Sequence, residues 1–595
     1  MKNTITSFLV LFFLIFTAVL KAENGQMLFV AELHSDNQIP PLQSDAIGLV
    51  TFLLSEDGKK ISVHGSFSDL SGAITGCHIH LGDFQTNGPV IINLMNFVSG
   101  NRIKGELVTP PDFLANALYG DFYVNVHTAL NPNGEIRGQL NFKSELLFPI
   151  VLQGINELPQ NGSTGIGLGV LRFSNNLTRF NYQVFYTGLT GPPTGAHIHK
   201  GDNQTNGPVL VPLVTTNIIQ GDVTDEALVF ETFINILDSG AYVNIHTAEF
   251  PNGEIRGQIL YPEALSSSSI LNGSQETPPV NSTANAYGYS FLNYPTFDSL
   301  FYIVLSEGIT ATNAHIHRGP AGTAGPVVVG LTSIAPGIYS GTAALTDQLR
   351  TAYLKDELYF NIHSTLNPNG EIRGQLENNL MKSFAFDLCG DQENPKKNIP
   401  AYAAAYVAVN KSNTELEYSV LVNDLTGEAT AAHFHGAAFG QNGSVILPID
   451  VPKPYATGVL DITGTIASKI DMDGAYMNVH TVANSGGEIR GQVRRSLSCD
   501  INTGLSDLSI NDIKFTQGQS NDLIYLQIEA DRNMDLNFDL LDINGNLVYN
   551  TTQSIYSGVN QVKIDVQNFT NGFYFLQVNK SGKMVKNFKW IIANE

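Results

Sequence analysis

The sequence predicts an all-β protein built from tandem β-sandwich or Greek-key domains. Residues that favour strands (Val, Ile, Tyr, Phe and Thr) are more prominent than long helical patterns. Glycine is also abundant, with 55 in 595 residues. Short strand-like runs alternate with turns built on NGP, NPNG and GG. A chain of this length exceeds one hydrophobic core, so we expect several domains.

The N-terminus carries a predicted signal peptide over residues 1–22. Lys2 precedes an apolar run at 8–20, and the small residue Ala22 follows. This run is too short to cross a bilayer as a helix, which takes about 20 residues. We expect export, cleavage after Ala22 and no transmembrane helix in the mature chain. The alternative is an uncleaved membrane anchor.

The chain has few charged residues, and acidic residues outnumber basic ones. Charged residues make up 14% of the chain, and 54 Asp and Glu against 32 Lys and Arg give a net charge of −22. Binding to a phosphate backbone needs clustered Lys and Arg, so this balance excludes nucleic acid as a partner.

One unit repeats four times along the chain. An H-x-H motif begins at positions 78, 197, 315 and 433, about 118 residues apart, and a block such as YVNVHTALNPNGEIRGQ follows it each time. We expect four domains of seven to nine strands each, following one another like beads with little linker. Their predicted ranges are 23–144, 145–262, 263–380 and 381–499.

A different pattern follows the last repeat. Residues 500–520 read as a polar linker, and 521–595 carry alternating strand patterns joined by NGN and SGK turns, without histidine. This segment predicts a separate, immunoglobulin-like β-sandwich.

Strand alternation decides which face the histidines occupy. Side chains two residues apart share a face of a strand, so His78 and His80 point one way and Cys77 and Ile79 the other. In the later strand of each repeat, Tyr, Asn and the third His share a face, and the aliphatic residues take the opposite one. We expect the aliphatic face to be the core and the histidines to lie on the outer, polar face.

Two interpretations of the histidines remain open. Three imidazoles per repeat, converging on one sheet, suit copper or zinc with an open position for water. The alternative is a hydrogen-bonded network, without metal, that pins the NPNG turn to the sheet and in which the Glu and Arg two residues apart, such as Glu135 and Arg137, form a pair. The candidate ligands are His78, His80, His127, His197, His199, His246, His315, His317, His363, His433, His435 and His480. The candidate fourth ligands or supporting residues are Glu135, Arg137, Glu254, Arg256, Glu371, Arg373, Glu488 and Arg490.

The three cysteines divide into a pair and a single residue. Cys389 and Cys499 flank the fourth repeat, and a disulfide between them would join the ends of that unit. Cys77 occupies a place that alanine takes in the other repeats, so we expect a small buried side chain rather than a nucleophile.

The motifs AHIHRG, GP, YVNVHT and NPNGEIRGQ resemble the CHRD domain, named for chordin, and cover about residues 23–498 four times over. The resemblance implies an extracellular, β-rich domain without an assigned enzymatic activity. The fourth repeat departs from the pattern, with NGS for NGP and NSGG for NPNG, so its turns are expected to differ.

The last 75 residues resemble the C-terminal sorting domain of type IX secretion cargo, through FDLLDINGNLVYN, GVNQVKIDV and FTNGFYFLQV. The resemblance implies the type IX machinery as a partner of 521–595, passage through the periplasm, and a secreted or surface-attached product.

The order of His78, His80 and His127 is similar to the copper ligands of copper–zinc superoxide dismutases, which lie on a Greek-key barrel. The long zinc loop of those enzymes has no counterpart here. Superoxide dismutase-like barrels and a redox-active metal site are therefore the second hypothesis. The first is a non-enzymatic, secreted or surface protein whose four domains bind an extracellular protein or polysaccharide.

Overall fold

The computed structural model describes residues 27–494, residue 499 and residues 513–592, with short gaps at 56–57, 119, 175–176, 217, 262, 294–295, 521–522, 531–533, 542–546, 556–557, 568, 570–571 and 581–582. The predicted signal peptide and residues 500–512 of the predicted linker lie outside this part. The chain divides into two compact units, Met1–Cys499 and Asp500–Glu595. No helix in the described part of the chain is long and apolar enough to cross a bilayer.

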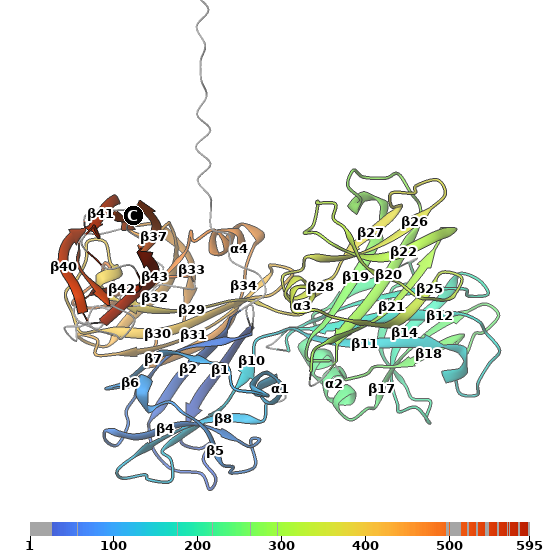
Figure 1. The fold of residues 1–595 in the computed structure, drawn as a ribbon. Helices are drawn as coiled ribbons and strands as arrows, with labels where there is room; N and C mark the ends of the chain where they lie inside the picture. The colour runs from blue at the N-terminus through green and yellow to red at the C-terminus, as the bar shows by residue number, and fades with distance from the viewer. Residues whose placement is uncertain are drawn as a thin grey trace, which may run out of the picture. The chain divides into compact units, whose positions relative to one another are not determined.

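Each of the four repeats is one curled antiparallel sheet with a short helix (Figure 1). The first repeat contains β1 (Met27–His34), β2 (Ile47–Leu54), β3 (Lys60–Ser68), β4 (Ile74–Leu81), β5 (Val90–Asn93), β6 (Val98–Ser99), β7 (Arg102–Val108), α1 (Phe113–Leu118), β8 (Phe122–Thr128), β9 (Ile136–Gln139) and β10 (Asn141–Phe142). The second contains β11 (Leu146–Gln153), β12 (Ile166–Phe173), β13 (Phe180–Thr187), β14 (Pro193–Lys200), β15 (Val209–Leu213), β16 (Ile218–Val223), α2 (Glu226–Leu237), β17 (Ala241–Thr247) and β18 (Ile255–Gln258).

The other two repeats follow the same plan. The third contains β19 (Ser266–Asn272), β20 (Asn285–Leu292), β21 (Ser299–Glu307), β22 (Ala311–Arg318), β23 (Val327–Gly330), β24 (Ser333–Ala335), β25 (Ile338–Ala344), α3 (Asp347–Leu354), β26 (Leu358–Ser364), β27 (Ile372–Gln375) and β28 (Glu377–Asn378). The fourth contains β29 (Lys382–Cys389), β30 (Tyr402–Val409), β31 (Glu415–Asn423), β32 (Ala429–Gly436), β33 (Ser444–Ile449), β34 (Tyr455–Asp461), α4 (Gly464–Asp471), β35 (Tyr476–Thr481) and β36 (Ile489–Gln492). Short 3-10 turns lie at Met95–Phe97, Gly154–Asn156, Gly273–Gln275 and Gly390–Gln392.

The all-β prediction is confirmed, and the strand count exceeds the expected seven to nine only in the first and third repeats. The first and third sheets have ten strands and the second and fourth have eight. Extra strands such as β6 and β10 are two residues long. They are defined by backbone pairing with a neighbouring strand and are too short to show an alternating pattern in the sequence.

The strand order brings three sequence motifs side by side. In the first repeat the order β5-β4-β8-β9-β1 places the H-x-H strand beside the strand of the third histidine, which in turn pairs with the GEIRGQ strand. The other three sheets repeat this order with β14-β17-β18, β22-β26-β27 and β32-β35-β36.

The core lies on the face that alternation predicts. Cys77, Ile79, Val124 and Val126 are all fully buried in one apolar cluster. Burial raises the pKa of the Cys77 thiol to about 12, which agrees with a packing residue rather than a nucleophile.

The helix in each repeat was not predicted from the sequence. The longest, α2, begins after Asp225, whose side chain accepts a hydrogen bond from the backbone N–H of Leu228. Val229, Thr232 and Ile236 are buried at a helical spacing. A single amphipathic helix of this length is hard to recognise in a sequence whose other segments mostly show strand patterns.

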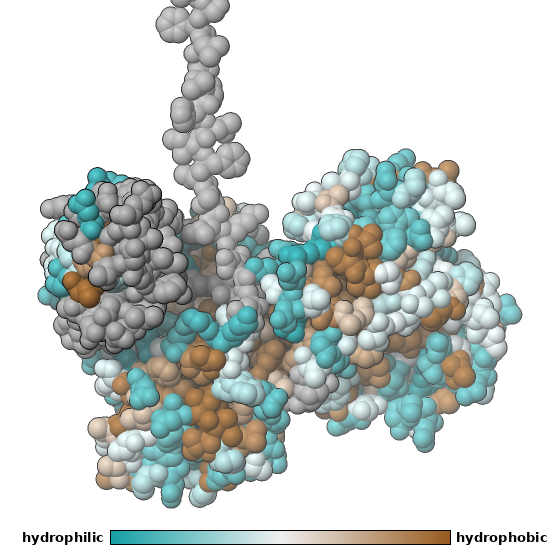
Figure 2. Space-filling view, viewed as in Figure 1, coloured by the Kyte–Doolittle hydropathy of each residue, from teal (hydrophilic) through white to brown (hydrophobic). Residues whose placement is uncertain are grey.

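The repeats are packed together rather than strung like separate beads. Leu28 and Leu49 of the first repeat share an apolar cluster with Tyr406 and Leu421 of the fourth. A similar cluster joins the second and third repeats through their strands β12 and β20. The visible surface in Figure 2 alternates between hydrophilic and hydrophobic patches, which agrees with the low share of charged residues.

Cys389, at the end of β29, forms a disulfide with Cys499, and their Cα atoms lie 5.8 Å apart. The bond links the first strand of the fourth repeat to the segment after its last strand, β36. It spans 110 residues of sequence.

The C-terminal unit is a β-sandwich. One sheet has the order β37-β38-β41 and the other β40-β39-β42-β43. Their facing residues form one core, with Leu526 and Ile564 from one sheet and Phe538 and Leu576 from the other. The strands are β37 (Ile513–Ser520), β38 (Leu523–Ala530), β39 (Met534–Leu541), β40 (Leu547–Ile555), β41 (Gly558–Asp565), β42 (Gly572–Lys580) and β43 (Lys583–Ile592).

Strand β37 occupies residues 513–520, which the sequence analysis assigned to the linker. Its polar composition concealed a strand that pairs along its whole length with β38.

Candidate metal centre

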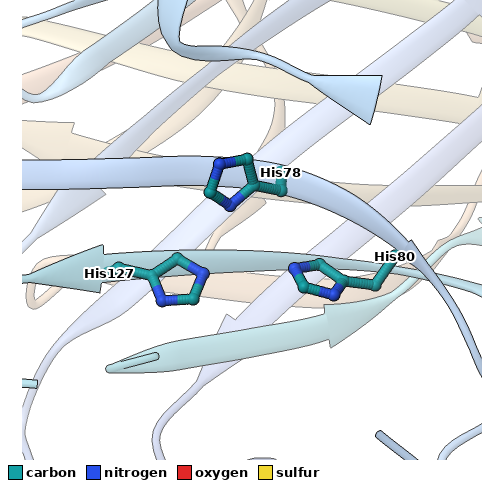
Figure 3. Close-up of side chains that lie close together, drawn as sticks. All are labelled: His78, His80 and His127. Atoms are coloured by element: carbon teal, nitrogen blue, oxygen red, sulfur yellow. The ribbon is translucent and has the colours of Figure 1, made fainter. Parts of the chain in front are cut away.

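Each repeat brings its three histidines together on the outer face of its sheet. In the first repeat His78 and His80 come from β4 and His127 from the neighbouring strand β8, and their rings converge (Figure 3). One ring nitrogen of each lies within 4.8 Å of the other two, and the same holds in the other three repeats.

Backbone carbonyls hold two of the three rings in a defined tautomer. The Nδ1 atom of His80 lies 2.9 Å from the carbonyl oxygen of Gly88, and that of His127 lies 3.0 Å from the carbonyl oxygen of Pro132. A carbonyl oxygen only accepts, so each Nδ1 carries the proton. The Nε2 atoms then present lone pairs.

These lone pairs have no hydrogen-bond partner among the described residues. In the first repeat the unpartnered, buried atoms are Nε2 of His80, Nε2 of His127 and Nδ1 of His78. Two of the rings disfavour a second proton: burial, and then the neighbouring histidines, lower the pKa of His78. Burial is the main cause that lowers the pKa of His80 as well. Neutral imidazoles with free lone pairs are the form that binds a metal.

The other repeats reproduce this arrangement. The second histidine donates from Nδ1 to the carbonyl of a glycine, and the third to the carbonyl five residues on. These bonds are His199 to Gly207, His317 to Gly325, His435 to Gly443, His246 to Pro251, His363 to Pro368 and His480 to Ser485. In the second, third and fourth repeats Nδ1 of the first histidine also donates a hydrogen bond to Nε2 of the third, at 3.2, 3.1 and 3.3 Å.

These separations fit a transition metal. Two nitrogens bound to one zinc at 2.0–2.1 Å in a tetrahedral site lie about 3.3 Å apart. The first and third histidines already meet that distance in three repeats, and the second lies within reach. His80 is 9% exposed and the other two rings are half-buried, so the triad lies near the surface while its converging nitrogens are buried.

An aromatic ring and a buried cation are stacked behind the second histidine. The Tyr123 ring lies 4.9 Å from the His80 ring at 15°, and the Arg137 guanidinium lies 3.5 Å from the centre of Tyr123. Arg137 and Tyr123 are each only 1% exposed. The corresponding pairs are Tyr242 with Arg256, Tyr359 with Arg373, and Tyr476 with Arg490.

The guanidinium organises the loop that holds the second histidine. Arg137 donates to the carbonyls of Asp83 at 2.5 Å and Thr86 at 2.9 Å, and to Oδ1 of Asn87 at 2.9 Å. The loop then reaches Gly88, whose N–H donates to the Tyr123 hydroxyl and whose carbonyl accepts from His80. Arg137 therefore positions His80 through the backbone of residues 83–88.

The structure separates the glutamate from this site. The Glu135 carboxylate accepts from the hydroxyls of Ser44, Ser71 and Thr128 and from the backbone N–H of Ser71. The expected pairing of Glu135 with Arg137 is replaced by these contacts, because the carboxylate and the guanidinium reach opposite loops. Glu254, Glu371 and Glu488 make the equivalent contacts with Ser or Thr hydroxyls.

Sequence reasoning missed two parts of the site. The first is the loop that covers the outer face, so that Asn125, at 4% exposed, is buried rather than surface-facing. The second is the glycine carbonyl that fixes the second histidine. The recurring NGP, AGP and NGS turns were the available signal, because their glycine, eight residues after the second histidine of each H-x-H, is this acceptor.

Two families account for most of the chain. The CHRD domain family matches residues 29–140, 148–259, 267–376 and 384–493, and the secretion system C-terminal sorting domain matches residues 520–593. These matches confirm the resemblances drawn from the motifs.

Individual relatives match more locally. Chordin of Danio rerio is 31% identical over 164 residues, which is 25% of this chain and 17% of that protein. Chordin of Xenopus laevis is 28% identical over 159 residues, 24% of this chain and 17% of that protein. The chain thus spans about a sixth of the length of these relatives. A DUF4785 family protein of Legionella pneumophila covers 55% of this chain and 81% of its own at 10% identity, with a TM-score of 0.12, which carries no structural inference.

Proposed function

The chain belongs to the CHRD domain family, and from that premise we propose that each of its four CHRD domains binds one copper or zinc ion through its histidine triad. The sorting domain directs the protein through type IX secretion to the cell surface or the extracellular space. The protein is then an exported array of four metal sites.

One observation carries this proposal: ring nitrogens of three histidines lie within 4.8 Å of one another in each domain, and the Nε2 atom of the second histidine, whose Nδ1 donates to a backbone carbonyl, has no hydrogen-bond partner among the described residues. Metal-bound histidines characteristically donate their other ring N–H to a carbonyl or carboxylate. All four domains keep this arrangement.

The competing interpretation is a structural network without metal. Such a network would pair its buried nitrogens, because each unpaired buried polar atom costs about 1–3 kcal/mol. The first repeat leaves three nitrogens unpaired, and Nε2 of His199, His317 and His435 is unpaired in the others. A metal satisfies all of these atoms at once.

The test measures metal content in the full mature chain. The protein is incubated with zinc or with copper, freed of loose metal and analysed for bound ions per chain. We expect four ions in the wild type and three in His80→Ala. His34→Ala, which removes a histidine outside the triads, is the matched control and should retain four. Wild-type protein without stoichiometric zinc or copper would contradict the proposal, as would equal losses in the two variants.

A further inference from the structure

One buried position beside the triad differs in charge among the four domains. The position is Gln38 in the first domain and glutamate in the others, at Glu157, Glu276 and Glu393. These side chains are only 6%, 4%, 7% and 6% exposed.

The side chain at this position lies one amide group away from the triad. In the second domain Asn244 pairs directly with His197 across β14 and β17, and opposite residues of an antiparallel pair have Cα atoms about 4.5–5.5 Å apart. The Asn244 amide donates to both carboxylate oxygens of Glu157, at 2.9 and 3.1 Å.

The first domain has the same geometry without the charge. Asn125 pairs with His78 across β4 and β8, and the Gln38 amide donates to the Asn125 carbonyl oxygen at 2.8 Å. The amide of Gln38 thus replaces the carboxylate of Glu157 at almost the same place.

Two charges around the first two sites match. Both have the stacked arginine, Arg137 or Arg256, and both have an exposed aspartate on the covering loop, Asp83 or Asp202. Other charges differ, because Leu81, Leu130 and Asp36 of the first domain correspond to Lys200, Glu249 and Ile155 of the second. The effect of the carboxylate is therefore tested by exchanging Gln38 and Glu157 within each domain, not by comparing the two sites with each other.

The third and fourth domains are less closely matched. They have Pro320 and Ala438 in place of the loop aspartate. In the fourth, the Lys397 ammonium also acts on Glu393 and partly offsets its charge.

We propose that this position sets the charge of the ion that each site prefers, so that Glu157 favours a divalent ion in the second domain and Gln38 leaves the first domain comparatively selective for Cu⁺. This inference rests on the proposed metal function. A carboxylate attracts Zn²⁺ with twice the energy with which it attracts Cu⁺. At a separation of about 10 Å and an effective dielectric constant of about 20, the difference amounts to about tenfold in relative affinity.

The comparison is best made where the carboxylate is charged. Burial raises the pKa of Glu157 to about 7, and Arg256 opposes that rise. Measurements at pH 8 therefore find Glu157 largely ionised before any metal is added.

The experiment uses full chains with one intact triad. Alanine at His197, His315 and His433 leaves only the first site, and alanine at His78, His315 and His433 leaves only the second. Zn²⁺ affinity is measured by competition with a chromophoric chelator. Cu⁺ affinity is measured likewise, without oxygen and with ascorbate, which spares the disulfide.

We expect exchange of glutamine and glutamate at this position to change the ratio of Zn²⁺ to Cu⁺ affinity about tenfold within one site. Gln38→Glu should raise the ratio of the first site by that factor, and Glu157→Gln should lower that of the second. Using both substitutions distinguishes a change in ion preference from a folding defect, because Glu157→Gln introduces the side chain that the first domain already carries. Val108→Glu, which adds the same charge at a 77% exposed position on β7, is the control and should leave the ratio unchanged.

The outcomes separate this inference from the proposed function. If both sites bind metal and neither exchange alters the ratio, the inference is overturned and the metal function stands. If neither chain binds Zn²⁺ or Cu⁺, both are overturned.

Discussion

Replacing Arg137 with methionine should loosen the loop at residues 83–88 without unfolding the domain. The guanidinium makes three hydrogen bonds to this loop and lies 3.5 Å from the Tyr123 ring. Methionine keeps most of the apolar stem but leaves the carbonyls of Asp83 and Thr86 without their donor.

The magnitude follows from those contacts. Hydrogen bonds to a charged group contribute about 1.5–3 kcal/mol each, and the stacked cation adds about 1–2 kcal/mol. Burial opposes these gains, since it lowers the pKa of the Arg137 guanidinium. We therefore expect a net loss of about 3 kcal/mol of local stability, which speeds exchange of the loop amides about a hundredfold.

Hydrogen exchange followed by mass spectrometry measures this effect in the full chain. The loop at residues 202–207 of the second domain, held by Arg256, is an internal reference in the same sample. Arg350→Met is the control variant, because among the described residues Arg350 forms its ion pair within its own helix, with Asp347. Wild-type exchange rates at residues 83–88 in Arg137→Met would refute the positioning role.

Two further predictions concern the second domain. In the metal-free protein, burial raises the pKa of Glu157 to about 7, above its unfolded value near 4.5. A group with a raised pKa stabilises the fold while it is protonated, so the free energy of unfolding should fall by up to about 3 kcal/mol between pH 4.5 and 7. Glu157→Gln should flatten that part of a pH series of denaturation curves, and an unchanged slope would contradict the assignment. Separately, Gly253 has a φ of +128°, and a Cβ there would lie 2.4 Å from the Asn244 amide and 2.6 Å from Glu157. Gly253→Ala should destabilise the domain by about 2 kcal/mol or more in denaturant unfolding. Gly191→Ala, at a position with no neighbour within 4 Å, should be near neutral, and equal effects of the two changes would contradict the steric argument.

Much of the fold followed from periodicity alone. The alternation of Cys77 and Ile79 with His78 and His80 identified the buried and outer faces, and the burial of the aliphatic set agrees with it. The repeat period placed the third histidine on a comparable strand in every domain. Both inferences use local spacing, which a strand preserves regardless of its partners.

Other features depended on contacts that local spacing does not encode. The loop at residues 83–88 covers the outer face of the sheet and buries it. Strand alternation therefore predicted that Arg137 lies on the polar face, but not that its side chain is buried. The spacing of Glu135 and Arg137 suggested a pair, yet loops from distant parts of the chain supply separate partners for each. The helix α2 and the packing between repeats were not predicted from the sequence, because they too depend on contacts that local spacing does not encode.

The energetics of the Arg137 stack bear on what the outer face is for. Taking a cation to 1% exposure is costly, and hydrophobic residues of similar volume often stabilise a fold as well or better. Here the guanidinium donates to backbone carbonyls and a loop amide, and all of these contacts serve the loop that ends at the Gly88 carbonyl. That carbonyl fixes the tautomer of His80 and leaves its Nε2 lone pair turned toward the other two rings. The same arrangement occurs at Arg256, Arg373 and Arg490, within four domains whose covering loops differ in sequence. A costly buried cation that is kept four times, each time behind the second histidine, is better explained by orienting that histidine than by stabilising the sheet.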